Sequence, residues 1–252
     1  MVNYFNINFI IRFLYRFKKW QRRKNQLKKF KIDFNRFIQI DKSRRFVMDW
    51  NDCLPMLHDN SYYTTFNTHY IYHPAWAARV LKEINPKTHV DFSSSLHFCT
   101  IISAFIPSVF YDYRPADLDL SDLESKRANL TNLELSDKSI DCLSCMHTIE
   151  HIGLGRYGDE LDSEGDIKAI KELQRVAIDH ILIVVPIGIP KIYFNAHRVY
   201  DPIEFVKYFT DCDLINFAFV DDLGNFKIDE MLENAVNEKF ACGCYHFRKK
   251  TV

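Results

Sequence analysis

Apolar and polar residues alternate in two ways along residues 59–252. Compact runs rich in apolar and β-branched residues predict strands at 89–92, within 108–115, and at 139–147, 180–188, 214–220 and 240–248. The run at 180–188 is continuously apolar, which is typical of a strand buried on both faces. Apolar residues at helical spacing between these runs predict helices at 75–84, 96–105, 163–177 and 203–210.

Local signals indicate where these elements begin and end. Pro74 suits the first turn of a helix, and Ser163 followed by Asp166 is a capping signal. Residues 122–135 are expected to form connecting structure, and a turn around Gly224 indicates an antiparallel pair of strands at an edge. Because strands alternate with helices, the sequence predicts an α/β fold with a doubly wound, mostly parallel sheet.

The first 58 residues have a different pattern and are expected to form a separate extension. Residues 4–38 contain neither Gly nor Pro and predict one helix. One face carries Ile10, Phe13, Leu14, Phe17 and Trp20, and an adjacent face carries Arg12, Arg16, Lys19 and Arg23. This pattern is typical of an amphipathic helix on an anionic membrane surface. Packing against the protein's own body or a partner is the alternative. Interleaved aromatic and basic residues also suit single-stranded nucleic acid, although no recognition module follows.

Charge divides the chain near the same position. The 33 basic and 33 acidic side chains give a net charge of zero, yet residues 1–50 carry +11 and residues 51–252 carry −11. With 47% hydrophobic residues the chain can bury a core, so wholesale disorder is excluded. The acidic body gives no indication of nucleic-acid binding, and the basic extension is better interpreted as a localisation segment than as part of a reaction centre.

Cysteine use and hydropathy indicate a compartment. No apolar run reaches the length of a transmembrane helix, and residues 5–14 lack the features of a signal peptide. Seven cysteines without disulfide spacing indicate reduced thiols, so we expect a cytoplasmic protein, peripheral on the inner face of the membrane if the extension binds lipid. Cys142 and Cys145 form a CxxC motif, but the apolar run around them favours a buried strand over a zinc or redox site.

Two aspartates follow the pattern of a nucleotide site. Asp91 lies on the first predicted strand of the sheet, and Asp112 ends the second, 21 residues later. An acidic residue at about this spacing suits a carboxylate that binds ribose hydroxyls. The loop after the first strand is Ser93, Ser94 and Ser95, which is small but contains no glycine. Two ordinary strand-end aspartates are the alternative.

Two further motifs are interpreted with less weight. Residues 153–158 spell GxGxxG, but they do not directly join a strand to a helix, as a dinucleotide loop must. Residues 147–151 spell HxxEH, a zinc-peptidase pattern. Because His147 is expected to end a strand, the two imidazoles need not share a helix face. The sequence therefore predicts no metal site.

Chemically versatile residues gather after two predicted strands. One group follows the strand at 139–147, and the other follows the strand at 180–188. Because these strands are expected to be neighbours, the groups could converge over one pocket. Histidine can act as a base near neutral pH, and arginine can bind a phosphate or carboxylate. The residues are His147, Glu150, His151, Arg156, Tyr157 and Asp159, then Asn195, His197 and Arg198.

Several of these stretches resemble a known class of enzyme. Asp91, Asp112, NLTNLELSDKSIDCLSCMHTIEHI and RVAIDHILIVVPIG resemble the successive motifs of class I S-adenosylmethionine-dependent methyltransferases. More specifically, HTIEHIGLGRYGDELDSEGD and FNAHRVYDP resemble a methyltransferase-like family of unknown function found in nematodes and bacteria. The resemblance runs from about Asp59 to the C-terminus, so residues 59–252 are expected to be the methyltransferase-like domain.

The resemblance implies a seven-stranded Rossmann-like sheet with an antiparallel last strand, and S-adenosylmethionine as the cofactor. Asp91 and Ser93 would lie near the methionine end of the cofactor, and Asp112 would bind the ribose hydroxyls. Asn129 and Leu130 would lie beside the adenine. The full set assigned to the cofactor is Asp91, Ser93, Asp112, Asn129, Leu130 and His147. The departure from the class is the serine loop in place of glycines.

The expected reaction is methyl transfer to an oxygen or nitrogen of a sugar or surface-glycan precursor. His197 or His151 would be the base, with Asp159 as the alternative, and the acceptor would be bound by Arg156, Tyr157, Asn195 and Arg198. Two other functions remain open. One is a non-catalytic scaffold with the same fold that docks membrane-bound glycan enzymes through the extension. The other is metal-dependent hydrolysis.

Overall fold

The computed structural model describes the backbone of residues 4–250 and the side chains of residues 14–250. The chain divides into two compact units, residues 1–65 and residues 66–252. In the first unit, α1 (Tyr4–Ile40) confirms the predicted long helix. After it, η1 (Trp50–Asp52) returns toward α1, where the Trp50 ring lies 5.0 Å from that of Phe34. Gln26 donates a hydrogen bond of 2.8 Å to the carbonyl of Leu57.

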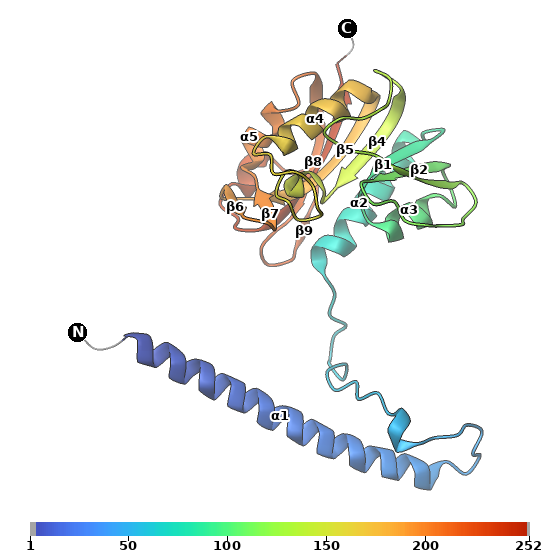
Figure 1. Ribbon diagram of the computed structural model, residues 1–252, viewed down its shortest axis with the longest axis vertical. Helices are drawn as coiled ribbons and strands as arrows, with labels where there is room; N and C mark the ends of the chain where they lie inside the picture. Colours follow the sequence, from blue (N-terminus) through green and yellow to red (C-terminus); the bar gives the residue numbers. More distant parts are fainter. Residues whose placement is uncertain (1–3, 251–252) are drawn as a thin grey trace. The chain divides into compact units, whose positions relative to one another are not determined.

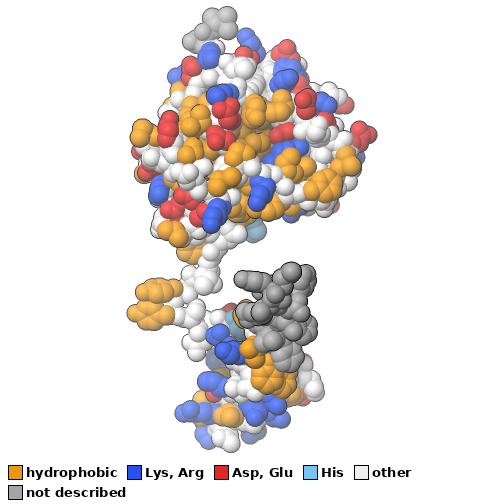
Figure 2. Space-filling view, turned by 90° about the vertical axis from the view of Figure 1, so that its left-hand side faces the viewer, with side chains coloured by type: hydrophobic (Ala, Val, Ile, Leu, Met, Phe, Trp, Pro, Cys, Tyr) orange, Lys and Arg blue, Asp and Glu red, His pale blue; other side chains and the backbone are white. Residues whose placement is uncertain are grey.

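The predicted apolar face of α1 does not extend along the whole helix. Leu14, Phe17 and Trp20 are exposed and lie on one side at 100° per residue, whereas the exposed Phe37 and Ile40 point to the other side. Of the predicted apolar face, Ile10 and Phe13 lie outside the residues whose side chains are described, as does Arg12 of the basic face. Figure 2 shows Lys and Arg side chains spread over the visible part of this unit. Among the described helices, none combines the length and the apolarity needed to cross a membrane.

The second unit is built on an eight-stranded sheet (Figure 1), whose strand order is β3-β2-β1-β4-β5-β10-β8-β9. The strands β1 to β5 are parallel, whereas β10 is antiparallel to both of its neighbours, β5 and β8. The bounds are β1 (His89–Phe92), β2 (Ser108–Asp112), β3 (Leu123–Arg127), β4 (Ile140–Met146), β5 (Ala177–Ile187), β8 (Cys212–Val220), β9 (Phe226–Lys227) and β10 (Ala241–Lys249). A separate hairpin consists of β6 (Lys191–Tyr193) and β7 (His197–Val199).

The predicted strands are confirmed, but two strands of the sheet are additional, as are the two strands of the β6–β7 hairpin. β3 lies inside the segment that was expected to be connecting structure. Its sequence, LESKR, buries only Leu123, so it has no apolar pattern from which a strand could be predicted. β9 has two residues and pairs with β8 across the turn that contains Gly224, which confirms the antiparallel edge. The expectation of seven strands was therefore one strand short of the observed sheet.

Helices cover both faces of the sheet (Figure 1). One face packs against Trp76 of α2 (Thr68–Ile84) and Phe98 of α3 (Leu96–Ile102). The other packs against Leu173 of α4 (Gly165–Val176) and Phe205 of α5 (Pro202–Lys207). Two short 3₁₀ helices complete the unit, η2 (Ile149–His151) and η3 (Leu232–Ala235). Helices cover both faces of the parallel strands, so a ligand cannot bind on the faces. The carboxyl ends of the strands remain accessible, and a site can form there.

Two predicted helix starts were wrong. α2 begins at Thr68, where the side chain of Asn67 accepts the backbone N–H of Tyr70 at 3.3 Å, and Pro74 lies inside the helix. Burial of Trp76 beyond the proline helps to offset the hydrogen bond that proline cannot donate. α4 begins at Gly165 without a side-chain cap, so Ser163 does not have the capping role that the sequence indicated.

The CxxC motif lies on β4, as the apolar pattern predicted. Cys142 contacts the cluster under α2 and α3, whereas Cys145 belongs to the cluster under α4 and α5. Residues three apart on a strand point to opposite faces, so these two thiols cannot share a metal ion or a disulfide. All seven cysteines lie in the described part of the chain, and all are free thiols.

Two neighbouring histidines predict a loss of stability in acid. His180 Nδ1 on β5 lies 2.9 Å from His246 Nε2 on β10, a contact that requires one donor and one acceptor. Burial and then His180 lower the pKa of His246 to about 4, with Asp179 acting in the opposite direction and Arg248 in the same direction. A histidine whose folded pKa is lowered stabilises the fold only above its unfolded pKa of about 6.5, and this contribution is lost as the pH falls toward 4.

His246→Gln is therefore expected to reduce the acid sensitivity of folding. Between pH 7.5 and pH 5, wild-type protein should lose roughly 1–2 kcal/mol more of its unfolding free energy than the variant. Urea denaturation at the two pH values measures the difference. Other buried histidines, such as His73 and His89, remain in both proteins and cancel in the comparison. Equal pH dependence in the two proteins would contradict the prediction.

Candidate functional site

The carboxyl ends of β1, β2 and β4 meet at one edge of the sheet and surround a cavity of about 430 Å³, here named the first cavity. Its walls come from the loops after these strands, from the loop after β3 and from the loop that follows η2. Small-molecule sites usually have volumes of about 300–1,000 Å³. Seven of the residues predicted to bind the cofactor or to act in catalysis line it: Ser93, Asp112, Asn129, Leu130, His147, His151 and Asp159. Tyr157, from the predicted acceptor set, lines it as well.

Serines form the turn after β1 in a conformation that glycine would adopt easily. Ser93 has a φ of +58°, in the left-handed region. Its carbonyl accepts a hydrogen bond of 2.8 Å from Thr148, and its hydroxyl donates to the carbonyl of Tyr111 at 3.2 Å. The Ser94 hydroxyl accepts the backbone N–H of Met146 at 2.9 Å. Side-chain hydrogen bonds therefore hold a tight turn without glycine, and the cavity beside it stays open.

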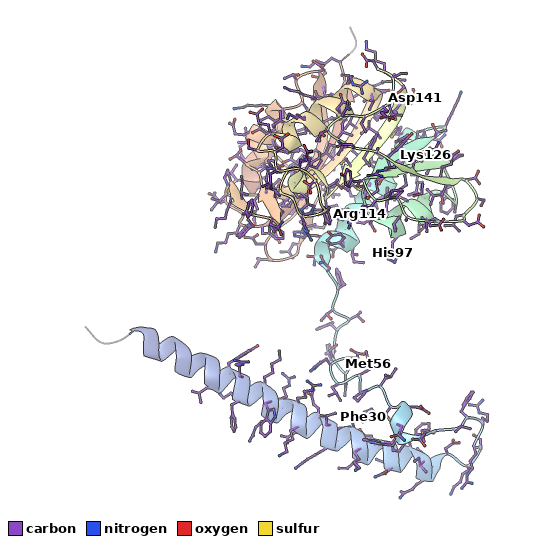
Figure 3. All side chains as sticks on the ribbon, in the orientation of Figure 1. Phe30, Met56, His97, Arg114, Lys126 and Asp141 are labelled. Carbon is purple, nitrogen blue, oxygen red and sulfur yellow. The ribbon has the colours of Figure 1, made fainter. Side chains whose placement is uncertain are left out.

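Asp112 lies where β2 ends and faces the first cavity. Its Oδ1 accepts the backbone N–H of Arg114 at 2.7 Å, which fixes the carboxylate. Within the described residues, no hydrogen bond is found at its Oδ2. Figure 3 labels Arg114 in the loop just beyond, where the guanidinium lies 4.7 Å from the ring centroid of Tyr157. Asn129 and Leu130 line the same cavity from the loop after β3, so a carboxylate, an amide and an apolar side chain surround one space.

Asp91 is not brought to the cavity. The side chain is 1% exposed, and it accepts hydrogen bonds from the Ser144 hydroxyl and from the backbone N–H of Ser94, the latter at 2.9 Å. Burial raises the pKa of Asp91 to about 6, against the opposing effect of these hydrogen bonds. Its position beneath the serine turn makes it a support for the turn.

A second cavity of about 620 Å³ adjoins the first. The two cavities share four lining residues, Ser93, His147, His151 and Tyr157. The other walls come from the first turn of α2, from the serine turn and from Phe240 before β10. Among the predicted residues, Arg156 and His197 line only this second cavity. From the predicted group after β5, only His197 therefore lies at a cavity together with the group after β4.

His151 stands at the boundary between the cavities with one ring nitrogen held. Its Nδ1 contacts the carbonyl of Ala196, so this nitrogen carries the proton and Nε2 is left with its lone pair. The Nε2 atom lies 3.7 Å from Oε1 of the buried Glu150. Burial lowers the pKa of His151, although Glu150 opposes this shift, so the imidazole is neutral at physiological pH. A neutral imidazole with a free lone pair can accept a proton.

His197 offers a second neutral imidazole. Its ring packs between aromatic side chains, with centroids 4.9 Å from Phe240 and 5.0 Å from Tyr193. Its Nε2 is buried and has no hydrogen-bond partner among the described atoms. Burial lowers the pKa of His197, and His151 adds to the shift. A neutral imidazole carries a lone pair on one ring nitrogen, so His197 is a second group that can accept a proton.

Asp159 organises the glycine-containing loop at residues 153–158. Its carboxylate accepts backbone N–H groups from Gly153 at 2.7 Å, from Tyr157 at 3.1 Å and from Gly155 at 3.3 Å. Burial raises the pKa of Asp159, but these N–H groups outweigh it and leave the pKa below its usual value. A carboxylate stabilised in its charged form is a weak base, so its geometry fits loop closure better than proton transfer.

The structure does not bring Asn195 or Arg198 to either cavity. Asn195 is exposed and donates a hydrogen bond of 3.3 Å to the carbonyl of Leu154. Arg198 is 5% exposed, and its guanidinium contacts backbone carbonyls, the shortest of them that of Ile152 at 2.7 Å. Both residues connect β6 and β7 to the loop around η2, so they shape the walls of the site from behind.

Several site residues were not predicted. His69 and Tyr70 line the second cavity from the first turn of α2, which was expected to begin only at Pro74. A stronger weight on Asn67 as an N-cap would have placed them on the helix. Phe240 and Cys242 approach from the start of β10, and no local pattern distinguishes them from core residues. His147 has a φ of +55°, which aims its ring at this group and which no sequence motif reveals.

Several known structures with a similar fold are described as methyltransferases. The small RNA methyltransferase HEN1 is 12% identical, with a TM-score of 0.51 over 76% of this chain and 27% of that chain. A Galdieria sulphuraria protein assigned as a sarcosine dimethylglycine methyltransferase is 11% identical, with a TM-score of 0.50 over 71% of this chain and 86% of that chain. A TehB-like SAM-dependent methyltransferase of Corynebacterium glutamicum is 14% identical, with a TM-score of 0.49 over 71% and 89%. The second unit thus has a methyltransferase fold.

The sequence comparisons add a family without an assigned activity. Residues 119–239 match the sequence profile of a family described as "Caenorhabditis protein of unknown function, DUF268". The matched segment runs from just before β3 to just before β10, so it includes the loop around η2 and the β6–β7 hairpin. A comparison with curated proteins found no match.

Proposed function

We propose that this protein is a methyltransferase that binds S-adenosylmethionine in the first cavity and a methyl acceptor in the second. The observation that carries the proposal is the sharing of Ser93, His147, His151 and Tyr157 by two adjoining cavities. A ligand in each cavity would meet at these residues, as methyl transfer requires of donor and acceptor. The methyltransferase fold supports the same assignment.

The first cavity fits the cofactor in three respects. Asp112 presents a carboxylate oriented by Arg114, as needed to accept hydrogen bonds from two ribose hydroxyls. Asn129 and Leu130 offer an amide and an apolar surface for an adenine ring. The left-handed turn at Ser93 keeps the backbone close to the cavity with a small side chain. The serine loop therefore retains the shape expected of the missing glycines.

The residues of the second cavity supply the remaining chemistry. The cofactor, when bound, supplies an electrophilic methyl group, so the protein has to orient the acceptor and accept its proton. His151 would accept the proton at Nε2, where the carboxylate of Glu150, 3.7 Å away, stabilises the resulting positive charge. His197 is the alternative base, and its ring centroid lies 6.4 Å from that of His151.

For the acceptor, we propose a small anionic molecule with a nucleophilic oxygen or nitrogen, such as a phosphorylated or nucleotide-linked sugar. Arg156 is exposed at the wall of the second cavity and could bind a phosphate. Tyr157 lies between two guanidinium groups, 4.7 Å from that of Arg114 and 5.0 Å from that of Arg156. This pair of cations adds to the attraction for an anion at the mouth of the site.

Asp112→Ala is expected to weaken S-adenosylmethionine binding strongly. Loss of hydrogen bonds from two hydroxyls to a charged carboxylate should cost about 2–3 kcal/mol, roughly a 30- to 150-fold rise in Kd. Isothermal titration calorimetry on the full chain, without added metal, measures both proteins. The matched control is Asp119→Ala, which removes the same charge from an exposed position that does not line either cavity.

The control should bind the cofactor as wild-type protein does. Absence of heat above buffer for wild-type protein at millimolar cofactor would overturn the proposal and leave the non-catalytic scaffold as the better explanation. Equal binding by Asp112→Ala and wild-type protein would show that the first cavity is not the cofactor site.

A further inference from the structure

Three potential metal ligands meet beside the second cavity, although they are far apart in sequence. They are His69 on the first turn of α2, His147 after β4 and Cys242 on β10. One donor atom from each lies within 4.8 Å of the other two. Among the described residues, this is the group of histidine, cysteine and acidic side chains arranged closely enough to bind one ion.

The distances are close to those of a tetrahedral metal site. Zinc bonds of about 2.0–2.1 Å to nitrogen and about 2.3 Å to sulfur place neighbouring ligand atoms roughly 3.3–3.6 Å apart. Nε2 of His147 and Sγ of Cys242 are already 3.4 Å apart. His69 is only half-buried on the first turn of α2, so a small change of its side-chain torsions would bring its ring nitrogen to the same centre.

A buried carboxylate orients the central ligand from behind. Nδ1 of His147 lies 2.9 Å from Oε1 of Glu150, which leaves Nε2 directed toward Cys242. Histidine ligands of metals usually donate their other N–H to a carboxylate in this way. Glu150 is 1% exposed, and its Oε2 has no hydrogen-bond partner among the described atoms. A dication with one thiolate and one nearby carboxylate would leave this buried group of side chains neutral.

The positive φ of His147 supports the same arrangement. A left-handed backbone costs energy for a residue other than glycine, and such strain gathers at functional sites. The turn directs the imidazole into an enclosure in which the ring centroids of Tyr70 and His73 lie 5.4 Å and 4.9 Å away. A relaxed strand end would point this side chain elsewhere.

We propose that His69, His147 and Cys242 bind one divalent transition-metal ion of the zinc class, with its fourth coordination position open to the second cavity. Two nitrogens and one thiolate are a donor set that zinc prefers, and three protein ligands are typical of a site that leaves room for an external ligand. His69 and His147 line the second cavity, so the open position faces it. The ion replaces the proton of the Cys242 thiol, which is released to solvent, and the two histidines bind through nitrogen lone pairs.

An oxygen of the acceptor is the ligand that suits the open position. A hydroxyl or phosphate oxygen bound there would be held beside the residues shared with the first cavity, and the metal would favour its deprotonated form. This role of the ion rests on the proposed methyl transfer, whereas metal binding itself does not. The ligand set also differs from the HxxEH motif, because Glu150 and His151 are not ligands in it.

Cobalt binding to the full chain tests the site directly. Protein stripped with a chelator should bind one equivalent of Co²⁺, with a thiolate-to-metal charge-transfer band and the strong visible absorption of four-coordinate cobalt. Cys242→Ser should lose the charge-transfer band, and His69→Ala should weaken binding about 10- to 100-fold. Zinc competition against the bound cobalt gives the affinity for Zn²⁺. Circular dichroism establishes that each variant is folded.

Matched controls lie outside the cluster. Cys53→Ser removes a thiol of the first unit, and His97→Ala removes an exposed imidazole on α3, which is labelled in Figure 3. Both should retain the spectrum and the affinity of wild-type protein. Absence of stoichiometric binding overturns the proposal, and so does a charge-transfer band that survives in folded Cys242→Ser. Unchanged affinity in His69→Ala, which alters only a half-buried side chain, overturns it as well.

The result is independent of the cofactor experiment, because cobalt is titrated without S-adenosylmethionine and the cofactor is titrated without metal. A protein that binds the metal but not the cofactor would retain this site and lose the proposed methyl transfer. A protein that binds the cofactor but not the metal would support the proposed cofactor site and contradict the proposed metal site.

Discussion

Arg198→Met is expected to lower the free energy of unfolding of the second unit by about 3–5 kcal/mol. The guanidinium is almost fully buried, and it connects the loop around η2 to the residues just before α4 through hydrogen bonds. Its Nη1 donates to the carbonyl of Ile152 at 2.7 Å. Its Nη2 lies within 3.5 Å of the carbonyls of Asp162 and Ser163.

The cost arises mainly from what the substitution leaves behind. Nε of Arg198 lies 3.4 Å from Oδ2 of Asp166, a carboxylate that is 5% exposed and also accepts a hydrogen bond of 2.9 Å from the Tyr200 hydroxyl. Methionine fills a similar volume but donates no hydrogen bond, so a buried charge and several carbonyls would lose their partner. An unpaired buried charge costs several kcal/mol, which is a large fraction of the stability of a domain.

Arg156→Met is the matched control for this prediction. Arg156 is exposed, so its removal should change the unfolding free energy by less than about 0.5 kcal/mol. It should, however, weaken binding of the anionic acceptor. Urea denaturation of the two variants and the wild-type protein measures the difference. If Arg198→Met were as stable as the wild-type protein, the guanidinium of Arg198 would not be needed for folding. The role in binding the acceptor that the sequence suggested would then be the better explanation for this residue.

The sheet could be predicted because each central strand carries its own hydrophobic signal. Residues 181–187 are apolar throughout and are buried in β5, whereas β3 is a polar edge strand that gives no such signal. Helix starts were harder, because Asn67 and Pro74 compete as signals and only tertiary packing decides between them. The strand order depends on pairing between distant segments, which a single sequence does not reveal.

The location of the two cavities could be predicted from the sequence, but not which polar residues face them. Strand ends and loops after β1, β2 and β4 were identified correctly as cavity walls, since parallel strands bring their carboxyl ends to one edge. Whether a polar residue faces the cavity or the protein depends on burial. Arg198 binds backbone carbonyls away from both cavities, whereas His69 reaches the second cavity from a helix whose start was misplaced. Residue type and spacing carry no information on that choice.

Gly153→Ala is expected to be among the most destabilising single substitutions in the loop around η2. Gly153 has a φ of +77°, and a Cβ atom there would lie 2.0 Å from the carbonyl oxygen of Asp162. This contact is with backbone, which cannot move aside as a flexible side chain can. The left-handed conformation alone costs about 1 kcal/mol for alanine, and the clash would force the loop open. A total loss of about 3 kcal/mol or more is therefore expected.

Gly158 in the same loop separates the two contributions. It has a φ of +85°, and a Cβ atom there would meet nothing within 4 Å. Gly158→Ala should therefore cost only the conformational term, about 1 kcal/mol, and thermal or urea denaturation of both variants gives the steric term as their difference. Because Gly153 also lines the first cavity, its substitution should weaken cofactor binding, whereas that of Gly158 should not. Equal destabilisation by the two substitutions would mean that the loop does not close against Asp162 as described.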